Sequence, residues 1–199
     1  MVEEPQGRLR ALGQLWEEGR RTIGEGQRFV PGEGSPTARL MIVGEAPGQE
    51  EVAQGKPFVG RSGQLLNRVL AEVSIPREQT WVTNVFKARP TTEVGGRLRN
   101  RPPTSAEARA GETLLRREIK VIHPTVIICL GNLAAQVLIS KDFKMNRDRG
   151  KWYEGPEGSR VTATFHPAYM LRQRGPERDR LLDLFRQDFR VAKQKLEEK

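Results

Sequence analysis

The sequence predicts an α/β fold built around a largely parallel sheet. Two kinds of segment alternate along its 199 residues, short runs rich in β-branched residues and longer amphipathic runs. That alternation is typical of strands and helices that follow one another in a layered sheet. A chain of this length buries roughly 70% of the surface that its unfolded form would expose, so one core is enough. We therefore expect a single domain over residues 1–199.

Four short runs are the expected strands. Two of them, Arg39–Val43 and Thr125–Leu130, are almost continuously apolar. Such runs predict central strands that are covered on both faces. The other two, Thr80–Val85 and Arg160–Phe165, complete the set of strands that the sequence indicates.

Four longer runs are the expected helices. One begins at the cap residue Ser62 and ends before Pro76, and its apolar residues follow the spacing of a helix face. Another begins with a capping box at Thr104–Glu107, in which two side chains satisfy free backbone N–H groups. The four helices are expected over Ser62 to Pro76, Thr104 to about Ile122, Asn132 to about Ile139, and from about Glu177 onward.

Three segments lie outside this pattern. Residues 1–36 contain a weak helix around Leu9–Trp16 and a Gly-rich connection, and we expect them to form an arm packed on the domain. Residues 173–199 are expected to form a C-terminal helix and a charged tail. Thr91–Thr104 is polar and basic and has neither strand nor helix period, so we expect a long loop that is either functional or mobile.

The composition excludes several classes of protein. The chain carries 34 Lys and Arg against 25 Asp and Glu, and this net charge of +9 favours nucleic acid or another polyanion as a partner. One cysteine, Cys129, and two histidines are too few for an intramolecular disulfide or a structural zinc site. The chain also lacks a long apolar run and a signal peptide. We therefore expect a cytoplasmic protein with no membrane partner.

Polar residues follow each expected strand. They are Gly44–Gly48 after the first, Asn84 and Lys87 at the second, Gly131–Asn132 after the third and His166–Tyr169 after the fourth. The carboxyl ends of parallel strands meet at one edge of a sheet, where ligands bind. No GxxxxGK[ST] or GxGxxG motif follows the first strand, and its acidic loop would repel phosphate. A nucleotide-phosphate site is therefore not expected.

Six ordered motifs resemble those of the family-four uracil-DNA glycosylases. The resemblance covers about Pro31 to Arg172, and the motifs are VGEAPGQEEVAQGKPFVGRSGQLLNRVL, VTNVFKARP, NRPPTSAE, HPTVIICLGNLAAQVL, RGKWYE and FHPAYMLR. It implies a three-layer α/β/α sandwich around a short, mainly parallel four-stranded central sheet. It also implies a monofunctional enzyme that flips deoxyuridine out of DNA and hydrolyses its N-glycosidic bond, which initiates base excision repair.

The resemblance implies how the flipped base is held. Asn84 reads uracil, because its amide can donate to O4 while it accepts from N3–H. Phe58 stacks on the base without selecting it. His166 donates to uracil O2 as negative charge develops on the leaving base.

The first motif also carries acidic residues. In the resembling family the acidic residue of GEAPG orients the attacking water or supports the cationic sugar, and a later acidic position contributes near it. We therefore expect Glu45 and Glu51 to be catalytic, favour Glu45 as the water-positioning group and interpret Glu50 as a solvated charge. The rest of the motif is expected to surround the base through Gly44, Ala46, Pro47 and Gly48.

Two regions are expected to hold DNA, whether single- or double-stranded. The loop after His166 resembles the family's intercalation loop, where apolar side chains wedge into the vacated stack. Basic connections supply candidate phosphate contacts, whose contribution falls with salt. The loop residues are Tyr169, Met170, Leu171 and Arg172, and the phosphate contacts are Lys87, Arg89, Arg97, Arg99 and Arg101. We expect a monomer that is associated with the nucleoid when bound to DNA.

The chain departs from the resembling family in its cysteines. Family-four enzymes hold a [4Fe–4S] cluster on four cysteines. Cys129 is expected to be a buried strand thiol and matches none of their positions. We therefore expect no cofactor and no metal. We expect the arm to be held by packing and polar contacts, including an ion pair between Glu17 and Arg20, which occupy the first two of the four cysteine positions. The four positions fall on Glu17, Arg20, Ala88 and Ala110.

An alternative of a different class stays open. A module of the same fold could sense DNA lesions or bind single strands without hydrolysis. The chain retains Asn84, Phe58, Glu45 and His166, which favours the enzyme. The basic loop has no histidine that could capture the sugar covalently, so the enzyme is expected to turn over.

Overall fold

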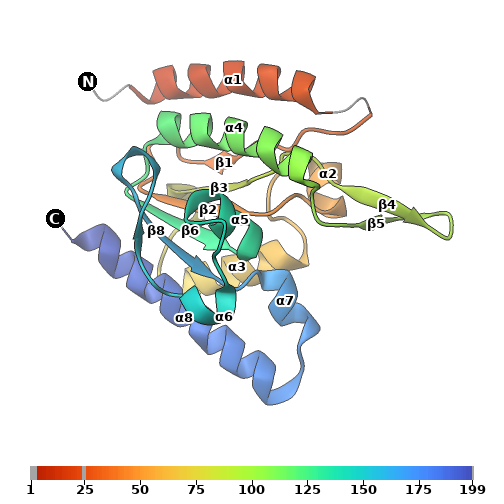
Figure 1. Ribbon diagram of the computed structural model, residues 1–199. Helices are drawn as coiled ribbons and strands as arrows, with labels where there is room; N and C mark the ends of the chain where they lie inside the picture. The colour runs from red at the N-terminus through yellow and green to blue at the C-terminus, as the bar shows by residue number, and fades with distance from the viewer. Residues whose placement is uncertain (1–3, 24–25, 199) are drawn as a thin grey trace.

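The computed structural model describes residues 4–23 and 26–198, so residues 1–3 and 24–25 of the expected arm and residue 199 of the tail lie outside it. A six-stranded sheet with the order β1-β3-β2-β6-β8-β7 forms its centre (Figure 1). The four inner strands are parallel, as the sequence predicts: β3 (Thr80–Asn84), β2 (Leu40–Gly44), β6 (Val126–Leu130) and β8 (Arg160–Thr164). Two short antiparallel strands are added at the edges, β1 (Glu33–Gly34) and β7 (Tyr153–Glu154).

Helices cover both faces of this sheet and complete the three predicted layers (Figure 1). One face packs against α3, α7 and α8, and the other packs against α4, α5 and the N-terminal helix α1. The helices are α1 (Pro5–Thr22), α2 (Gln49–Gln54), α3 (Arg61–Glu72), α4 (Ser105–Ile122), α5 (Asn132–Leu138), α6 (Met145–Asp148), α7 (Pro167–Arg172) and α8 (Gly175–Glu197). Short 3₁₀ turns lie at Arg77–Gln79 and Pro156–Gly158. None of the helices described is both long and apolar enough to span a membrane.

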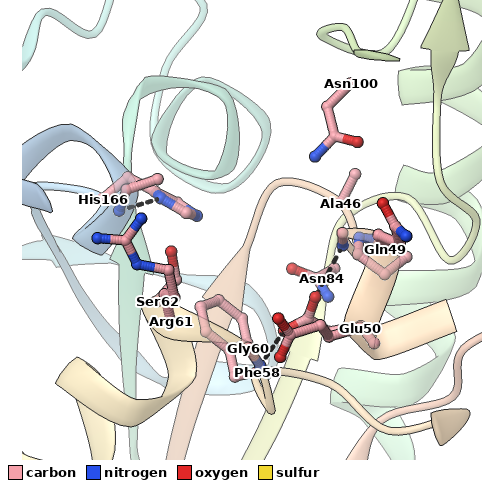
Figure 2. A pocket seen from close by; sticks show the side chains of 14 residues that line it. Ala46, Gln49, Glu50, Phe58, Gly60, Arg61, Ser62, Asn84, Asn100 and His166 are labelled. Carbon is pink, nitrogen blue, oxygen red and sulfur yellow. Dashed lines mark hydrogen bonds between the residues drawn. The ribbon is translucent and has the colours of Figure 1, made fainter. Parts of the chain in front are cut away.

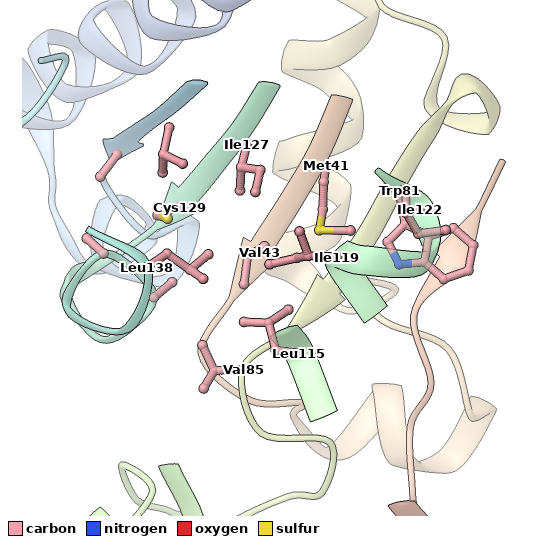
Figure 3. Close-up of a cluster of buried hydrophobic side chains, with 14 of the residues drawn as sticks. Met41, Val43, Trp81, Val85, Leu115, Ile119, Ile122, Ile127, Cys129 and Leu138 are labelled. Carbon is pink, nitrogen blue, oxygen red and sulfur yellow. The ribbon is translucent and has the colours of Figure 1, made fainter. Parts of the chain in front are cut away.

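The inner strands have buried side chains on both faces, because successive residues of a strand point to opposite sides. Met41 and Ile127 face α4 and α5, and Figure 3 shows them within this cluster of buried side chains. Their neighbours Ile42 and Ile128 face α3 and α8. Cys129 lies in the α4 and α5 layer and is fully buried, as expected, and this burial raises the pKa of its thiol.

The N-terminal helix α1 lies along α4 (Figure 1). Leu12 of this helix packs in the core. The buried guanidinium of Arg8 donates to the carbonyl oxygens of Ile122 at 2.6 Å and Pro36 at 3.1 Å. The expected ion pair on this helix is present, with 2.6 Å between Arg20 and Glu17. Packing and polar contacts of this kind join α1 to the sheet domain.

The prediction of an irregular loop over Thr91–Thr104 was wrong for most of its length. Strands β4 (Thr91–Val94) and β5 (Arg97–Asn100) form an antiparallel hairpin that projects from the rest of the fold (Figure 1). Its turn is Gly95–Gly96, and both glycines have positive φ angles, which two-residue hairpin turns require. The strands were missed because nearly all of their side chains are exposed, so no alternation of apolar and polar residues marks them.

Candidate functional site

A pocket with a volume of about 280 Å³ lies at the carboxyl ends of β2, β3 and β8. Figure 2 shows Phe58, Asn84 and His166 around it, each delivered by a different segment of the chain. This is the edge of the sheet at which the parallel strands place their polar ends. The residues that line the pocket are Ala46, Pro47, Gly48, Gln49, Glu50, Glu51, Phe58, Gly60, Arg61, Ser62, Asn84, Asn100, His166 and Ala168.

Asn84 is the last residue of β3, and the oxygen of its amide is buried without a partner. The residue is 3% exposed, and its Oδ1 accepts no hydrogen bond from any part of the chain that the structure describes. Leaving a buried acceptor unsatisfied costs about 1–3 kcal/mol. A ligand that brings an N–H group to this oxygen would remove that cost.

Gly44 ends β2 beside Asn84 and leaves the space that the pocket needs. A Cβ atom at this position would stand 2.4 Å from Asn84 Oδ1 and 2.4 Å from Cζ of Phe58. Contacts that short are not sterically possible, so any side chain here would displace one of the two groups. Gly44 therefore lets Asn84 and Phe58 approach each other.

Phe58 lies opposite Asn84 in a strained backbone conformation. Its φ angle is 54°, in the left-handed region that bulky residues rarely adopt. The Arg77 guanidinium fixes the preceding turn by donating to the Pro57 carbonyl at 2.9 Å. Gly63 allows α3 to pass close by, because a Cβ there would lie 1.7 Å from the Phe58 carbonyl oxygen. Such strain is retained at sites where a side chain has to point in a required direction.

Glu51 fixes the other side of the Phe58 turn. Its Oε1 accepts from the backbone N–H groups of Val59 at 3.0 Å and Gly60 at 2.7 Å, and its Oε2 accepts from Gly48 at 3.1 Å. Both oxygens of the carboxylate are therefore already bonded to the backbone. This geometry makes Glu51 a positioning residue of the pocket wall, and its expected catalytic role stays a prediction.

His166 is the N-cap of α7, and this position fixes which ring nitrogen carries the proton. Its Nδ1 accepts a hydrogen bond from the backbone N–H of Ala168 at 3.1 Å, so the neutral ring carries its proton on Nε2. Burial, with a smaller effect from the charge of Arg172, lowers the pKa of His166 to about 4. The ring is therefore neutral at neutral pH and offers one N–H donor. It lies 6.1 Å from the Phe58 ring, centroid to centroid.

The acidic residues of the first motif are arranged differently from the expectation. Glu45, the favoured water-positioning group, is half-buried and does not line the pocket, although burial raises the pKa of its carboxyl group. Glu50, interpreted as only solvated, does line it and lies near Gly60 in Figure 2. The expected Ala46, Pro47 and Gly48 are part of the pocket wall.

Several residues of the pocket were missed in the sequence. Arg61 and Ser62 open α3 directly after the Phe58 turn, and their place in the GRSG stretch of the first motif was the available signal. Asn100 reaches the pocket from β5, and nothing in the sequence placed that hairpin over the site. The other missed residues are Gln49, Gly60 and Ala168.

The expected phosphate contacts separate into three groups. Lys87 is 1% exposed, so the prediction that it reaches a DNA phosphate was wrong. Arg101 forms two hydrogen bonds with Glu107, and Arg89 donates to Asn100 Oδ1 at 2.7 Å. Arg97 and Arg99 are exposed on the hairpin, and no ion pair is found for them among the described residues.

The expected wedge loop is the short helix α7. Tyr169 is 41% exposed, Leu171 is half-buried and Arg172 is exposed. Met170 is 0% exposed and packs in the core with α3 and α8, which contradicts its expected entry into DNA. The helix therefore offers Tyr169 and Leu171 as its apolar groups.

The residues do not fit a [4Fe–4S] cluster. The whole chain has one cysteine, and Cys129 is buried inside β6. Glu17 and Arg20 are paired with each other, and Ala88 is buried. Ala110 is exposed, whereas the next residue of α4, Gly111, faces inward, where a Cβ would lie 2.4 Å from the Val85 carbonyl oxygen. Ala110, the expected position of the fourth cysteine, therefore lies on the outer side of α4, whereas Gly111 faces the core.

Comparison with known proteins identifies related chains. The Uracil DNA glycosylase superfamily profile matches residues 31–190. A type-4 uracil-DNA glycosylase of Thermotoga maritima is 40% identical over 154 residues, which is 77% of each chain. One from Archaeoglobus fulgidus is 40% identical over 150 residues, 72% of each chain. A type-5 uracil-DNA glycosylase of Thermus thermophilus is 28% identical over 83% of this chain and 81% of its own.

Proposed function

Because this chain belongs to the uracil DNA glycosylase superfamily, we propose that it is a uracil-DNA glycosylase, which hydrolyses the N-glycosidic bond of deoxyuridine in DNA and so initiates base excision repair. The observation that carries the proposal is the buried Oδ1 of Asn84 in the pocket, which has no partner among the described residues. Uracil has an N3–H donor that can satisfy this oxygen, and the Asn84 amide nitrogen can donate to uracil O4. Cytosine has an acceptor at N3 and a donor at N4, so both contacts would be mismatched.

Phe58 and His166 complete the handling of the base. The Phe58 ring stacks on uracil, a contact worth about 1–3 kcal/mol that does not depend on base identity. His166 presents its Nε2–H to uracil O2, where negative charge develops as the bond to the sugar breaks. A donor fixed in advance at such a position typically lowers the barrier by a few kcal/mol. The neutral ring is suited to this task, because it donates without carrying a charge into the buried pocket.

The attacking water remains the proposed task of Glu45. The support is its place directly after Gly44 and the raised pKa of its carboxyl group, which makes it a better base than a solvated glutamate. Glu50 is the competing candidate because it lines the pocket. Separate Glu45→Gln and Glu50→Gln variants decide between them, since only the residue that activates water should lower the rate of bond cleavage.

The DNA itself is proposed to lie across the pocket mouth between the hairpin and α7. Arg97, Arg99 and Arg172 are exposed there and supply positive charge, and Tyr169 and Leu171 supply apolar contact. We propose a monomer of one domain, residues 1–199 with residues 1–36 as its arm, that acts in the cytoplasm and on the nucleoid without a cofactor. The net charge of +9 supports the DNA partner, and the single cysteine of the chain supports a protein without a cluster.

One experiment tests the activity. The protein is incubated with a single-stranded oligonucleotide containing one uracil, and alkali then cleaves the strand wherever the base has been removed. Cleavage by the wild type, reduced about 100-fold or more in Asn84→Ala and His166→Ala, is the expected result. Intact strands with retained DNA binding would instead favour a module that binds DNA without hydrolysis.

A further inference from the structure

A buried polar cluster lies directly behind the pocket, and the proposed chemistry does not use it. Lys87 Nζ lies 2.5 Å from Glu118 Oε2, and both side chains are 0% exposed. The other carboxylate oxygen of Glu118 accepts from Trp81 Nε1 at 2.7 Å. A buried ion pair is a weak source of stability, because removing both charges from water offsets their attraction. The cluster is therefore better explained by what it holds in place.

Lys87 holds the residue that faces the base. Its ammonium group donates to the backbone carbonyl of Asn84 at 2.8 Å and also to the Thr83 hydroxyl. The ladder between β2 and β3 ends at the pair Gly44 and Asn84, and the N–H groups of Val85 and Phe86 still donate to the carbonyl oxygens of Gly44 and Glu45. The carbonyl oxygen of Asn84 itself is held by Lys87. The Asn84 Oδ1 has no partner among the described residues, and the backbone therefore determines where the amide points.

We infer that Lys87, held by Glu118, is a positioning residue that sets where Asn84 presents its amide to uracil. This inference rests on the proposed role of Asn84 in reading the base. Burial lowers the pKa of Lys87, and a neutral amine would still donate to the Asn84 carbonyl, so the hydrogen bond does not depend on a full positive charge. The relevant property of Lys87 is its donor group at that place.

The cluster also connects the N-terminal helix to the pocket. Lys87 Nζ lies 5.7 Å from the centroid of the Trp16 ring, within the range of a cation–π contact. Trp16 belongs to α1, which contributes no residue to the pocket wall. The family profile begins at residue 31, so α1 lies outside the matched region. Helix α1 therefore contacts Lys87, which in turn holds the backbone of Asn84.

Two variants test the donor group of Lys87 while the carboxylate of Glu118 is absent from both. Glu118→Gln keeps an acceptor for Trp81 and leaves Lys87 free to donate to Asn84. The double variant Lys87→Met/Glu118→Gln carries the same substitution at position 118 but lacks the donor, and Met fills the space of the lysine stem. Because neither protein retains an unpaired carboxylate, the pair differs in the donor group of Lys87, which contacts the Asn84 carbonyl, the Thr83 hydroxyl and the Trp16 ring.

The variants are compared by single-turnover excision of uracil and by binding to DNA that carries a tetrahydrofuran abasic analogue. The double variant should excise uracil about 10- to 100-fold more slowly than Glu118→Gln, the cost of a misplaced reading group. Its affinity for the abasic DNA should stay within about threefold, because no base is read there. Trp16→Leu should reduce excision by a smaller factor of about 2 to 5, the size of an ordinary cation–π contact.

Arg8→Met is the matched control for a loss of stability alone. Arg8 is another buried cation that donates to backbone carbonyls beneath α1, but its partners Ile122 and Pro36 are not part of the pocket. It should lower the melting temperature without changing the excision rate of the folded protein. Equal excision by Glu118→Gln and by the double variant would overturn the inference, as would a double variant that does not fold. A wild type that excises no uracil would instead contradict the proposed function.

Discussion

The Glu51 carboxylate joins Gly48 to Gly60, with one oxygen 3.1 Å from the N–H of Gly48 and the other 2.7 Å from the N–H of Gly60. These two glycines belong to the two loops that form one wall of the pocket, the loop after β2 and the turn after Phe58. A single side chain therefore sets the distance between them. Phe58 lies on the second loop and keeps its strained conformation only while that loop is held.

Replacing Glu51 by Gln should loosen this wall. The amide nitrogen of Gln cannot accept a hydrogen bond, so at least one backbone N–H loses its partner, at a cost of about 1–3 kcal/mol. We expect a lower free energy of unfolding, measured in urea, and uracil excision reduced about 10- to 100-fold by the displaced Phe58 ring. Glu50→Gln, at the exposed neighbouring carboxylate, is the control for stability. Full activity in Glu51→Gln would show that the wall does not depend on this carboxylate.

Gly44→Ala should close the pocket. The added methyl group would overlap both Asn84 Oδ1 and the Phe58 ring, each at 2.4 Å, so one of them has to move away from the base. We expect uracil excision to fall by about 100-fold or more, as for a misplacement of about 1 Å. Gly13→Ala in α1 is the matched control, since a Cβ there meets nothing within 4 Å and should leave the rate unchanged. Normal excision by Gly44→Ala would mean that the base binds elsewhere.

The neutral state of His166 predicts how stability changes in acid. The folded pKa is about 4 against an ordinary value of 6.5, so between these values the unfolded chain binds more protons than the folded one. The free energy of unfolding should therefore fall as the pH drops from 6.5 towards 4, by at most about 1.4 kcal/mol per pH unit from this group. Urea unfolding at pH 7.5 and 4.5 measures it, and His166→Gln should lose less stability over this range. The same loss in both proteins would assign it to other groups.

The hairpin arginines should control the salt dependence of DNA binding. Arg97 and Arg99 are exposed on β5, and each phosphate contact contributes about 0.9 to the slope of log affinity against log salt for duplex DNA. Arg97→Ala/Arg99→Ala should therefore lower that slope by about 1 to 2, with little change in the cleavage step. Fluorescence anisotropy from 50 to 300 mM salt gives the slope. Arg20→Ala on α1 removes a remote cation, and an equal effect there would argue against a specific role of the hairpin.

The sequence predicts the layered fold well because the inner strands and the packed helices carry their own apolar patterns. Two local signals illustrate this. The apolar pair Leu65 and Leu66 of α3 packs in the core, and the Thr104–Glu107 capping box is present at the start of α4. The hairpin over Thr91–Asn100 has no such pattern, since its side chains face solvent. Its two glycines were the remaining signal.

The motif residues Asn84, Phe58 and His166 meet at one pocket because they follow strands or turns that end at the same edge of the sheet. The tasks of the charged residues could not be predicted in the same way. Lys87 and Glu51 occupy motif positions, but their partners Glu118 and Gly60 are distant in sequence or are backbone groups. Whether a charge faces water, a ligand or a buried partner is decided by tertiary contacts, which a linear pattern does not contain.

The buried thiol of Cys129 simplifies labelling of this protein. Thiol-directed dyes react with an accessible thiolate, and this side chain is neither accessible nor readily ionised. Because the chain has one cysteine, a second one introduced at Leu98 on the hairpin or at Tyr169 would be the sole reactive site. A fluorophore could then report on the hairpin or α7 as DNA binds, without first replacing the native cysteine.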